Sequence, residues 1–179
     1  LVEVTTTDAF GGSSTFTSAS QQVANVDDAA TGTVTITGTV EEGSALLSDI
    51  SLNDEDGALT FAYQWQSSDV SNANFTDIFD ASNANFTIPS DQTMVDKYLR
   101  LQVIATDVSG GITTLNSASQ QVANVNDAPT ITSTANTSAT EDSAYSYTVV
   151  TSDVDGVDTI TLTAPTKPTW LNFDAASGV

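Results

Sequence analysis

The sequence predicts an all-β protein made of tandem β-sandwiches in a linear array. Three observations support this fold class: a long repeat recurs along the chain, short segments alternate β-branched with small or polar residues, and turn residues separate these segments. Hydrophobic residues make up 39% of the 179 residues. That fraction is enough for small sandwich cores and too high for a disordered acidic tail.

A repeated segment sets the domain frame. The segment SASQQVANVDDA begins at Ser18 and recurs as SASQQVANVNDA at Ser117, an offset of 117 − 18 = 99 residues. The same offset pairs Asp56 with Asp155 without any gap. We therefore expect three parts: the C-terminal strands of a preceding repeat (1–28), one complete repeat (29–128) and the N-terminal part of a following repeat (129–179).

The complete repeat contains about seven short strand-like segments, the number typical of an immunoglobulin-like sandwich. In chain order we predict strands at 33–40, 45–52, 59–66, 77–79, 84–88, 98–105 and 112–125. The third of these places Phe61, Tyr63 and Trp65 on one face, so Trp65 is expected in the core. The segment 107–111, DVSGG, is a hairpin signal between the last two strands.

Composition excludes several function classes. Three Lys or Arg stand against 23 Asp or Glu, which gives a net charge of −20 and disfavours nucleic acid as a partner. The chain has no His and no Cys, so His acid/base catalysis, thiol chemistry, disulfides and the usual zinc sites are excluded. No apolar run approaches ~20 residues, so no membrane insertion is expected. If the protein is exported, we expect its targeting signals outside this chain.

The topology of a sandwich gathers acidic residues at its ends. The loop after the second strand and the last hairpin both lie beside the incoming linker, which brings together Asp27, Asp28, Asp54, Asp56 and Asp107. At the other end, Glu41 and Glu42 in the turn after the first strand, with Asp91 or Asp96, face the outgoing linker 124–127 and the next domain's Asp153 and Asp155. Like charges so close repel unless a cation lies among them, and oxygen ligands suit Ca²⁺.

These residues carry a resemblance that covers the whole chain. The linker VNDAPT, the early acid of TEDSAY, the Asp-x-Asp-Gly loop and the hairpin ATDVSGG resemble the cadherin-like repeats of giant bacterial surface adhesins of the RTX type. The end segment PTWLNFDAASGV resembles a dystroglycan-type cadherin-like or bacterial immunoglobulin-like half-domain. Ala128 replaces a second linker Asn, and the usual Asp-Arg-Glu element is absent, which leaves the number of ions per junction open.

The resemblance implies calcium bound between successive domains. Carried over residue by residue, it assigns Asp28, Asp54, Asp56 and Asp107 to one junction. It assigns Glu42, Asn126, Asp127, Asp153 and Asp155 to the other. The function it implies is that of a calcium-stiffened, non-enzymatic extender or adhesion repeat of a large secreted or cell-surface bacterial protein. The expected partners are neighbouring repeats of the same chain, with polysaccharide or another surface protein in addition.

Simpler readings remain beside these expectations. A single Asp-x-Asp-Gly is more often a solvated turn than a ligand site, although three such elements at one spacing favour calcium. The loop is not an EF-hand, because its Gly is misplaced and no Glu follows at the twelfth position. A polysaccharide-binding module, or an accessory domain of a secreted hydrolase, is the rival function. Exposed aromatic side chains on a sheet face would favour that rival.

Overall fold

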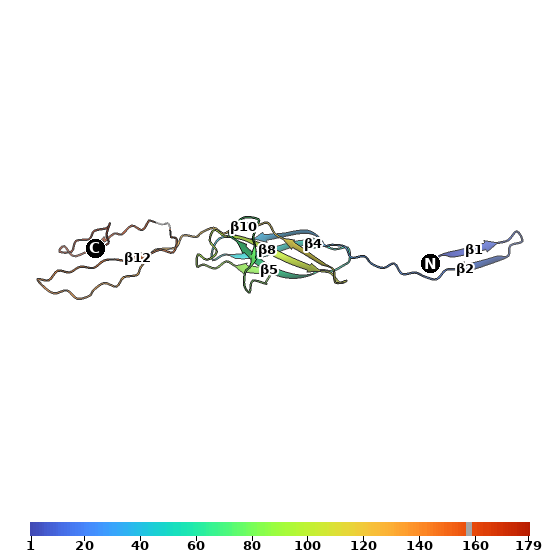
Figure 1. The fold of residues 1–179 in the computed structure, drawn as a ribbon, viewed down its shortest axis with the longest axis horizontal. Coiled ribbons are helices and arrows are strands. Elements are labelled where there is room, and N and C mark those ends of the chain that lie inside the picture. Colours follow the sequence, from blue (N-terminus) through green and yellow to red (C-terminus); the bar gives the residue numbers. More distant parts are fainter. Residues whose placement is uncertain (157–158) are drawn as a thin grey trace.

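A computed structural model describes residues 1–156 and 159–179 of the chain. Figure 1 shows an elongated molecule with a hairpin at the N-terminal end, a two-sheet sandwich in the middle and an open segment at the C-terminal end. All regular elements among the described residues are β-strands, and the sheets are antiparallel. The predicted all-β class is therefore confirmed.

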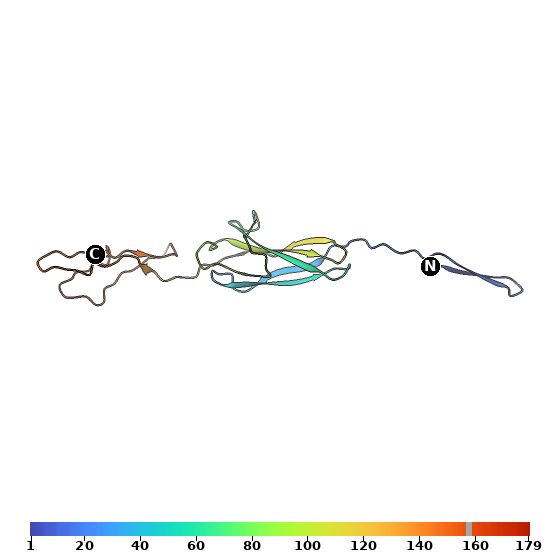
Figure 2. The ribbon, with the colours of Figure 1, turned by 90° about the horizontal axis from the view of Figure 1, so that it is seen from below.

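The first sheet of the sandwich has three strands. Its order is β3 (Thr31–Thr37), β4 (Ala45–Asn53) and β7 (Asn85–Thr87), with Val34 opposite Ile50. Alternation along β3 buries Val34 and Ile36 and leaves the threonines on either side of each exposed. Figure 2 shows this sheet lying against the second one.

The second sheet has five strands around the long pair β5 (Thr60–Ser68) and β8 (Tyr98–Thr106). The short strand β6 (Thr76–Asp77) pairs with β5, while β9 (Ile112–Asn116) and β10 (Gln120–Gln121) both pair with β8. The predicted single strand over 112–125 is therefore wrong. The Ser117 hydroxyl accepts the Leu101 N–H at 2.9 Å, in place of a backbone carbonyl, and this interrupts the strand.

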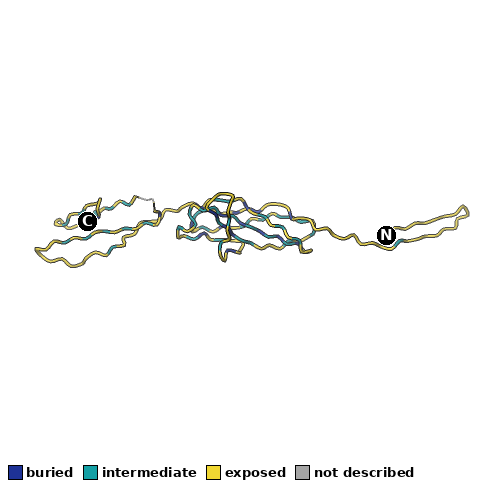
Figure 3. Tube along the Cα trace, viewed as in Figure 1, coloured by how far each residue is buried: buried dark blue, intermediate teal, exposed yellow. Residues whose placement is uncertain are grey.

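The core lies between the two sheets, where Figure 3 shows the buried residues concentrated. Trp65 has an exposed fraction of 0%, stacks on Phe86 with 5.5 Å between ring centroids, and donates its indole N–H to the Asn83 carbonyl at 2.9 Å. Trp65 is thus a core residue, as predicted. Phe61 shares its strand face but lies near the strand end and is 37% exposed.

The two end segments have less regular structure than the sandwich. At the N-terminal end, β1 (Glu3–Thr7) and β2 (Ser13–Thr17) form an isolated, exposed hairpin. At the C-terminal end, β11 (Thr130–Ile131) and β12 (Thr151–Ser152) form one short ladder. The hairpin turn closes through Asp8 N–H to the Gly12 carbonyl, as the turn after β8 closes through Asp107 N–H to the Gly111 carbonyl.

One parallel contact sets the position of the second acidic cluster. Glu41 forms a parallel bridge with Ala123, just after β10. The Ala123 N–H donates to the Val40 carbonyl at 2.9 Å, and the Glu42 N–H donates to the Ala123 carbonyl at 3.2 Å. The turn after β3 is therefore held beside the chain where it leaves the sandwich.

Candidate metal centres at the two ends of the sandwich

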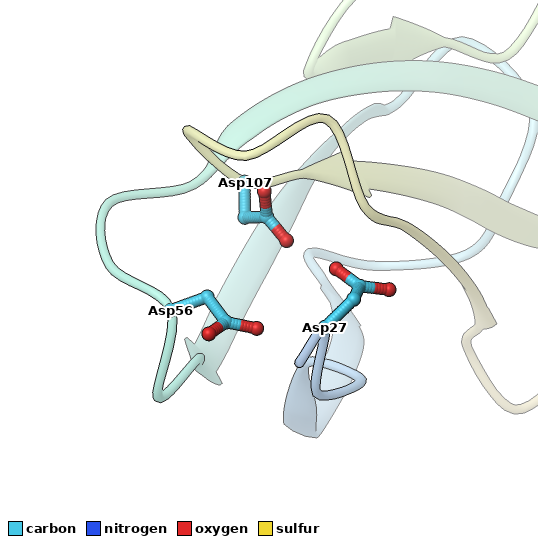
Figure 4. Close-up of side chains that lie close together, drawn as sticks. All are labelled: Asp27, Asp56 and Asp107. Atoms are coloured by element: carbon cyan, nitrogen blue, oxygen red, sulfur yellow. The ribbon is translucent and has the colours of Figure 1, made fainter. Parts of the chain in front are cut away.

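The first centre, here called the entry cluster, consists of Asp27, Asp56 and Asp107. Each residue offers a carboxylate oxygen, and the three oxygens lie within 4.8 Å of one another. The residues come from the incoming linker, the loop between β4 and β5, and the turn between β8 and β9 (Figure 4). The sequence prediction that this end of the fold gathers acids agrees with this placement.

Asp107 is the fixed member of the entry cluster. Its exposed fraction is 8%, and its Oδ1 accepts the backbone N–H groups of Ser109, Gly110 and Gly111. Burial alone would raise the pKa of Asp107, but these N–H donors outweigh it and hold the pKa below its ordinary value. Asp107 therefore stays ionised at neutral pH.

Asp27 has the opposite electrostatic behaviour. A hydrogen bond shared with Asp107 is the largest cause that raises the pKa of Asp27, followed by burial and by repulsion from the carboxylates of Asp107, Asp56 and Asp54. The metal-free entry cluster thus disfavours the charged form of Asp27, which takes up a proton more easily than an ordinary aspartate.

Gly111 is required by this close approach of carboxylates. A Cβ atom at this position would overlap with Asp27 Oδ1 and Asp107 Oδ2. Any other residue would therefore displace the oxygen atoms that define the entry cluster.

The second centre, here called the exit cluster, consists of Glu42, Asp127 and Asp155. Their carboxylate oxygens also lie within 4.8 Å of one another. Glu42 follows the parallel bridge, Asp127 lies in the outgoing linker, and Asp155 follows β12. Glu42 and Asp155 are 6% and 8% exposed, so two of the three carboxylates are buried.

Glu42 carries an unsatisfied oxygen in this cluster. Its Oε1 accepts the Val125 N–H at 2.8 Å and the Gln92 side-chain amide at 3.1 Å. Its Oε2 is buried and has no hydrogen-bond partner among the residues that the structure describes. Buried polar atoms are almost always paired, so an unpaired carboxylate oxygen beside two further carboxylates fits a cation ligand.

The two centres share one hydrogen-bonding scheme. Asp56 accepts the Asn25 side-chain amide and the Asp28 N–H, each at 2.6 Å. Asp155 accepts the Asn124 side-chain amide at 2.9 Å and the Asp127 N–H at 2.6 Å. The partners at the second centre are those of the first shifted by the 99-residue repeat offset. The same local structure is therefore built twice.

No protein cation neutralises either centre in the part of the chain that the structure describes. Lys97 forms the one salt bridge found there, with Asp69 at 2.6 Å. Arg100 donates to Gln66 Oε1 at 2.7 Å and lies 4.3 Å from the Phe75 ring centroid. The third cation, Lys167, donates to a backbone carbonyl at 2.7 Å. Among the described residues, none of these three cationic side chains therefore forms an ion pair with a carboxylate of either centre.

Comparison with known proteins finds a similarity in one part of the chain. Residues 128–179 match the He_PIG family, described as "Putative Ig domain". The match covers under a third of the chain, in the segment where an immunoglobulin-like or dystroglycan-type half-domain was expected. Together with the two-sheet fold, it supports an immunoglobulin-like domain. No curated protein matches the chain. None of the described residues belongs to a helix long and apolar enough to span a membrane.

The other predicted site residues form hydrogen bonds in the loops and linkers next to the two clusters. Asp54 and Asp153 each accept the backbone N–H two residues later, at 2.8 and 3.0 Å, and so shape the loops. Asp28 contributes its backbone N–H. Asn126 donates its side-chain amide to the Asp127 carbonyl at 3.1 Å.

Three amide side chains were missed by the sequence analysis. Asn25 and Asn124 recur in the repeated segment, and that recurrence could have marked them. Gln92 has no such signal, because the residue 99 positions later lies outside the 179 residues. All three donate to carboxylates of the two clusters.

Proposed function

We propose that the chain is a calcium-stiffened, non-enzymatic extender or adhesion repeat of a large secreted or cell-surface bacterial protein. The observation that carries the proposal is the buried, unpartnered Glu42 Oε2 within the exit cluster. The immunoglobulin-like fold supports an extracellular module of this kind.

Calcium is the cation that suits the ligand chemistry. The clusters offer carboxylate, amide and backbone oxygens, and the chain has neither His nor Cys. Ca²⁺ takes 6–8 such oxygens at about 2.3–2.6 Å in an adaptable geometry. Glu42, Asp127 and Asp155 would hold the ion at the exit cluster, and Asp27, Asp56 and Asp107 would hold it at the entry cluster.

The repeat offset turns the two clusters into complementary halves of one junction. A shift of 99 residues places Asp28 on Asp127 and Asp56 on Asp155. In an array, each junction would then receive a Glu42-type carboxylate from the domain before it and an Asp107-type carboxylate from the domain after it. The full set exceeds either cluster alone.

Stiffening follows from where the ligands originate. Without metal, the carboxylates repel across the boundary between domain and linker and favour separation of the loops. An ion bound by both sides replaces this repulsion with attraction and holds the two domains in one orientation. Because Pro129 also restricts the linker, the bound array would behave as a rod.

Calcium titration of the 179-residue chain tests the proposal. Calorimetry should detect binding that a chelator reverses, and small-angle scattering should give a narrower distribution of dimensions with calcium than with chelator. Magnesium at equal concentration serves as the control, because it demands a tighter octahedral shell. No heat of binding and identical scattering in calcium and chelator would contradict the proposal.

A polysaccharide-binding module, alone or as an accessory domain of a secreted hydrolase, is the second candidate. Trp170 is 66% exposed and meets Tyr145 edge to face at 6.4 Å, in a hollow of about 630 Å³ that is also lined by Asn172 and Asp174. Aromatic faces beside polar groups suit sugar rings. Retention on insoluble polysaccharide that Trp170→Ala abolishes would favour this candidate.

A further inference from the structure

Gln92 stands out because its backbone is strained and its side chain joins two repeats. Its φ is 63°, in the left-handed region that residues with a side chain rarely adopt. Its amide Nε2 lies 3.1 Å from Glu42 Oε1 in the same sandwich and 3.0 Å from Asp155 Oδ1 in the following segment. Such strain at a loop tip is retained where the surroundings favour one side-chain position.

The local turn holds Gln92 in this position. Asp91 Oδ1 accepts both the backbone N–H and the hydroxyl of Thr93, and these bonds lower the pKa of Asp91. The Gln92 carbonyl accepts the Val95 N–H at 3.3 Å. The turn is therefore closed on both sides of Gln92, and its side chain is directed to the exit cluster.

The distances around the Gln92 amide match those between ligands on one ion. Two oxygens bound to Ca²⁺ at about 2.4 Å, at angles of about 72–90°, are separated by about 2.8–3.4 Å. The 3.0 and 3.1 Å separations of the amide nitrogen from Asp155 and Glu42 fall within this range. A half-turn about the last side-chain bond places Oε1 where Nε2 lies, without moving the backbone.

We infer that Gln92 is a two-state amide ligand of the exit cluster, an inference that rests on the proposed calcium function. In the metal-free protein, the NH₂ group donates to Glu42 and Asp155 and holds the junction together. When calcium binds, the amide rotates and its Oε1 coordinates the ion. Gln92 thus links the calcium-free and calcium-bound forms of the same junction.

Charge explains why an amide, and not a third acidic loop residue, suits this role. The three carboxylates of the exit cluster already outweigh one divalent ion. A glutamate at 92 would add charge that favours calcium but would increase repulsion in its absence. A glutamine supplies a ligand oxygen when calcium is bound and a hydrogen-bond donor when it is absent. The contact across the junction is therefore kept at low calcium.

NMR of the full chain tests the inference at one site at a time. The Asp127 N–H reports the exit cluster and the Asp28 N–H the entry cluster, because each donates to the cluster's loop aspartate. In the wild type, calcium should shift the Gln92 side-chain NH₂ signals and speed their exchange with solvent, because the group loses its acceptors. The entry cluster, which contains no Gln92, is the internal control.

Three substitutions separate the possible roles of Gln92. Gln92→Met should weaken calcium at the exit cluster about tenfold and leave the entry cluster unchanged. Gln92→Asn introduces a residue that tolerates the left-handed backbone, but its shorter side chain cannot reach the exit cluster. It should therefore weaken calcium binding as Gln92→Met does. This variant separates the loss of the ligand from any perturbation of the backbone in Gln92→Met. Gln92→Glu should bind calcium at least as tightly as the wild type and should melt at a lower temperature in chelator.

The outcomes distinguish this inference from the proposed function. If the wild type shows no calcium shift at either reporter amide, the proposed function fails and the inference falls with it. If the wild type binds calcium but Gln92→Met and Gln92→Asn bind it with wild-type affinity at the exit cluster, only the inference is overturned. Unchanged Gln92 NH₂ exchange on saturation with calcium would also overturn it.

Discussion

The substitution Glu42→Gln should have opposite effects with and without calcium. Glu42 takes part in two of the three carboxylate pairs of the exit cluster, whose oxygens lie within 4.8 Å. At an effective dielectric of about 20, each pair repels by about 3 kcal/mol, and screening at physiological salt leaves about 2 kcal/mol. Because Asp127 is exposed to solvent, we reduce the summed repulsion energy of the two pairs that contain Glu42 to roughly 2 kcal/mol.

The calcium-bound side of this prediction follows from mass action. With a dissociation constant of about 10⁻⁴ M, 1 mM calcium stabilises the folded junction by about 1.4 kcal/mol. That corresponds to a rise of roughly 6–11 °C in melting temperature for a domain of this size. Glu42→Gln should melt higher than the wild type in chelator and should lose most of the calcium-induced rise.

Differential scanning calorimetry in chelator and in 1 mM calcium measures both effects. Asp49→Asn is a matched control, because it removes one exposed carboxylate from β4, far from the cluster residues in the fold, and should keep the full calcium response. The reasoning is refuted if Glu42→Gln keeps the wild-type response to calcium, or if it melts lower than the wild type in chelator.

Two further predictions concern the entry cluster. Gly111→Ala should abolish the calcium-induced NMR shift of the Asp28 N–H, because the added Cβ overlaps with two carboxylates of the entry cluster. The Asp127 N–H should still respond. Equal loss of the shift at both amides would contradict this prediction. In chelator, stability should rise as pH falls from neutral through the raised folded pKa of Asp27, then fall below about 3.8 as the depressed pKa of Asp107 is approached. Asp27→Asn should remove the rise alone, as urea unfolding across pH would measure.

The strand pattern was predictable because burial of one sheet face leaves a mark at every second residue. The segments predicted at 45–52 and 98–105 correspond to Ala45–Asn53 and Tyr98–Thr106. The interruption after β9 was not predictable in this way. It depends on the Ser117 hydroxyl, which accepts a hydrogen bond in place of a backbone carbonyl. The periodicity of apolar residues does not predict which side chains bond to the backbone in this way.

The acidic clusters were predictable from topology, but their internal arrangement was not. Loop order alone places acids at each end of a sandwich, as it did for Asp56 and Asp107. Topology alone leaves open whether Glu41 or Glu42 faces the linker, but Glu42 recurs as Glu141 at the 99-residue offset and Glu41 does not. The parallel bridge to Ala123, which holds Glu42 in place, has no sequence signal. Gln92 was missed because neither its left-handed φ nor its reach to the following segment has a sequence signal.

The parallel contact beside Glu42 also determines how the sandwich bears tension. In the proposed array, a pull would enter the sandwich through the linker before β3 and leave it through the chain after β10. The contact of Glu41 with Ala123 runs parallel to that pull, so its hydrogen bonds are loaded in shear and must break together instead of one after another. In the proposed array, these two backbone hydrogen bonds would resist force at the point where one domain connects to the next.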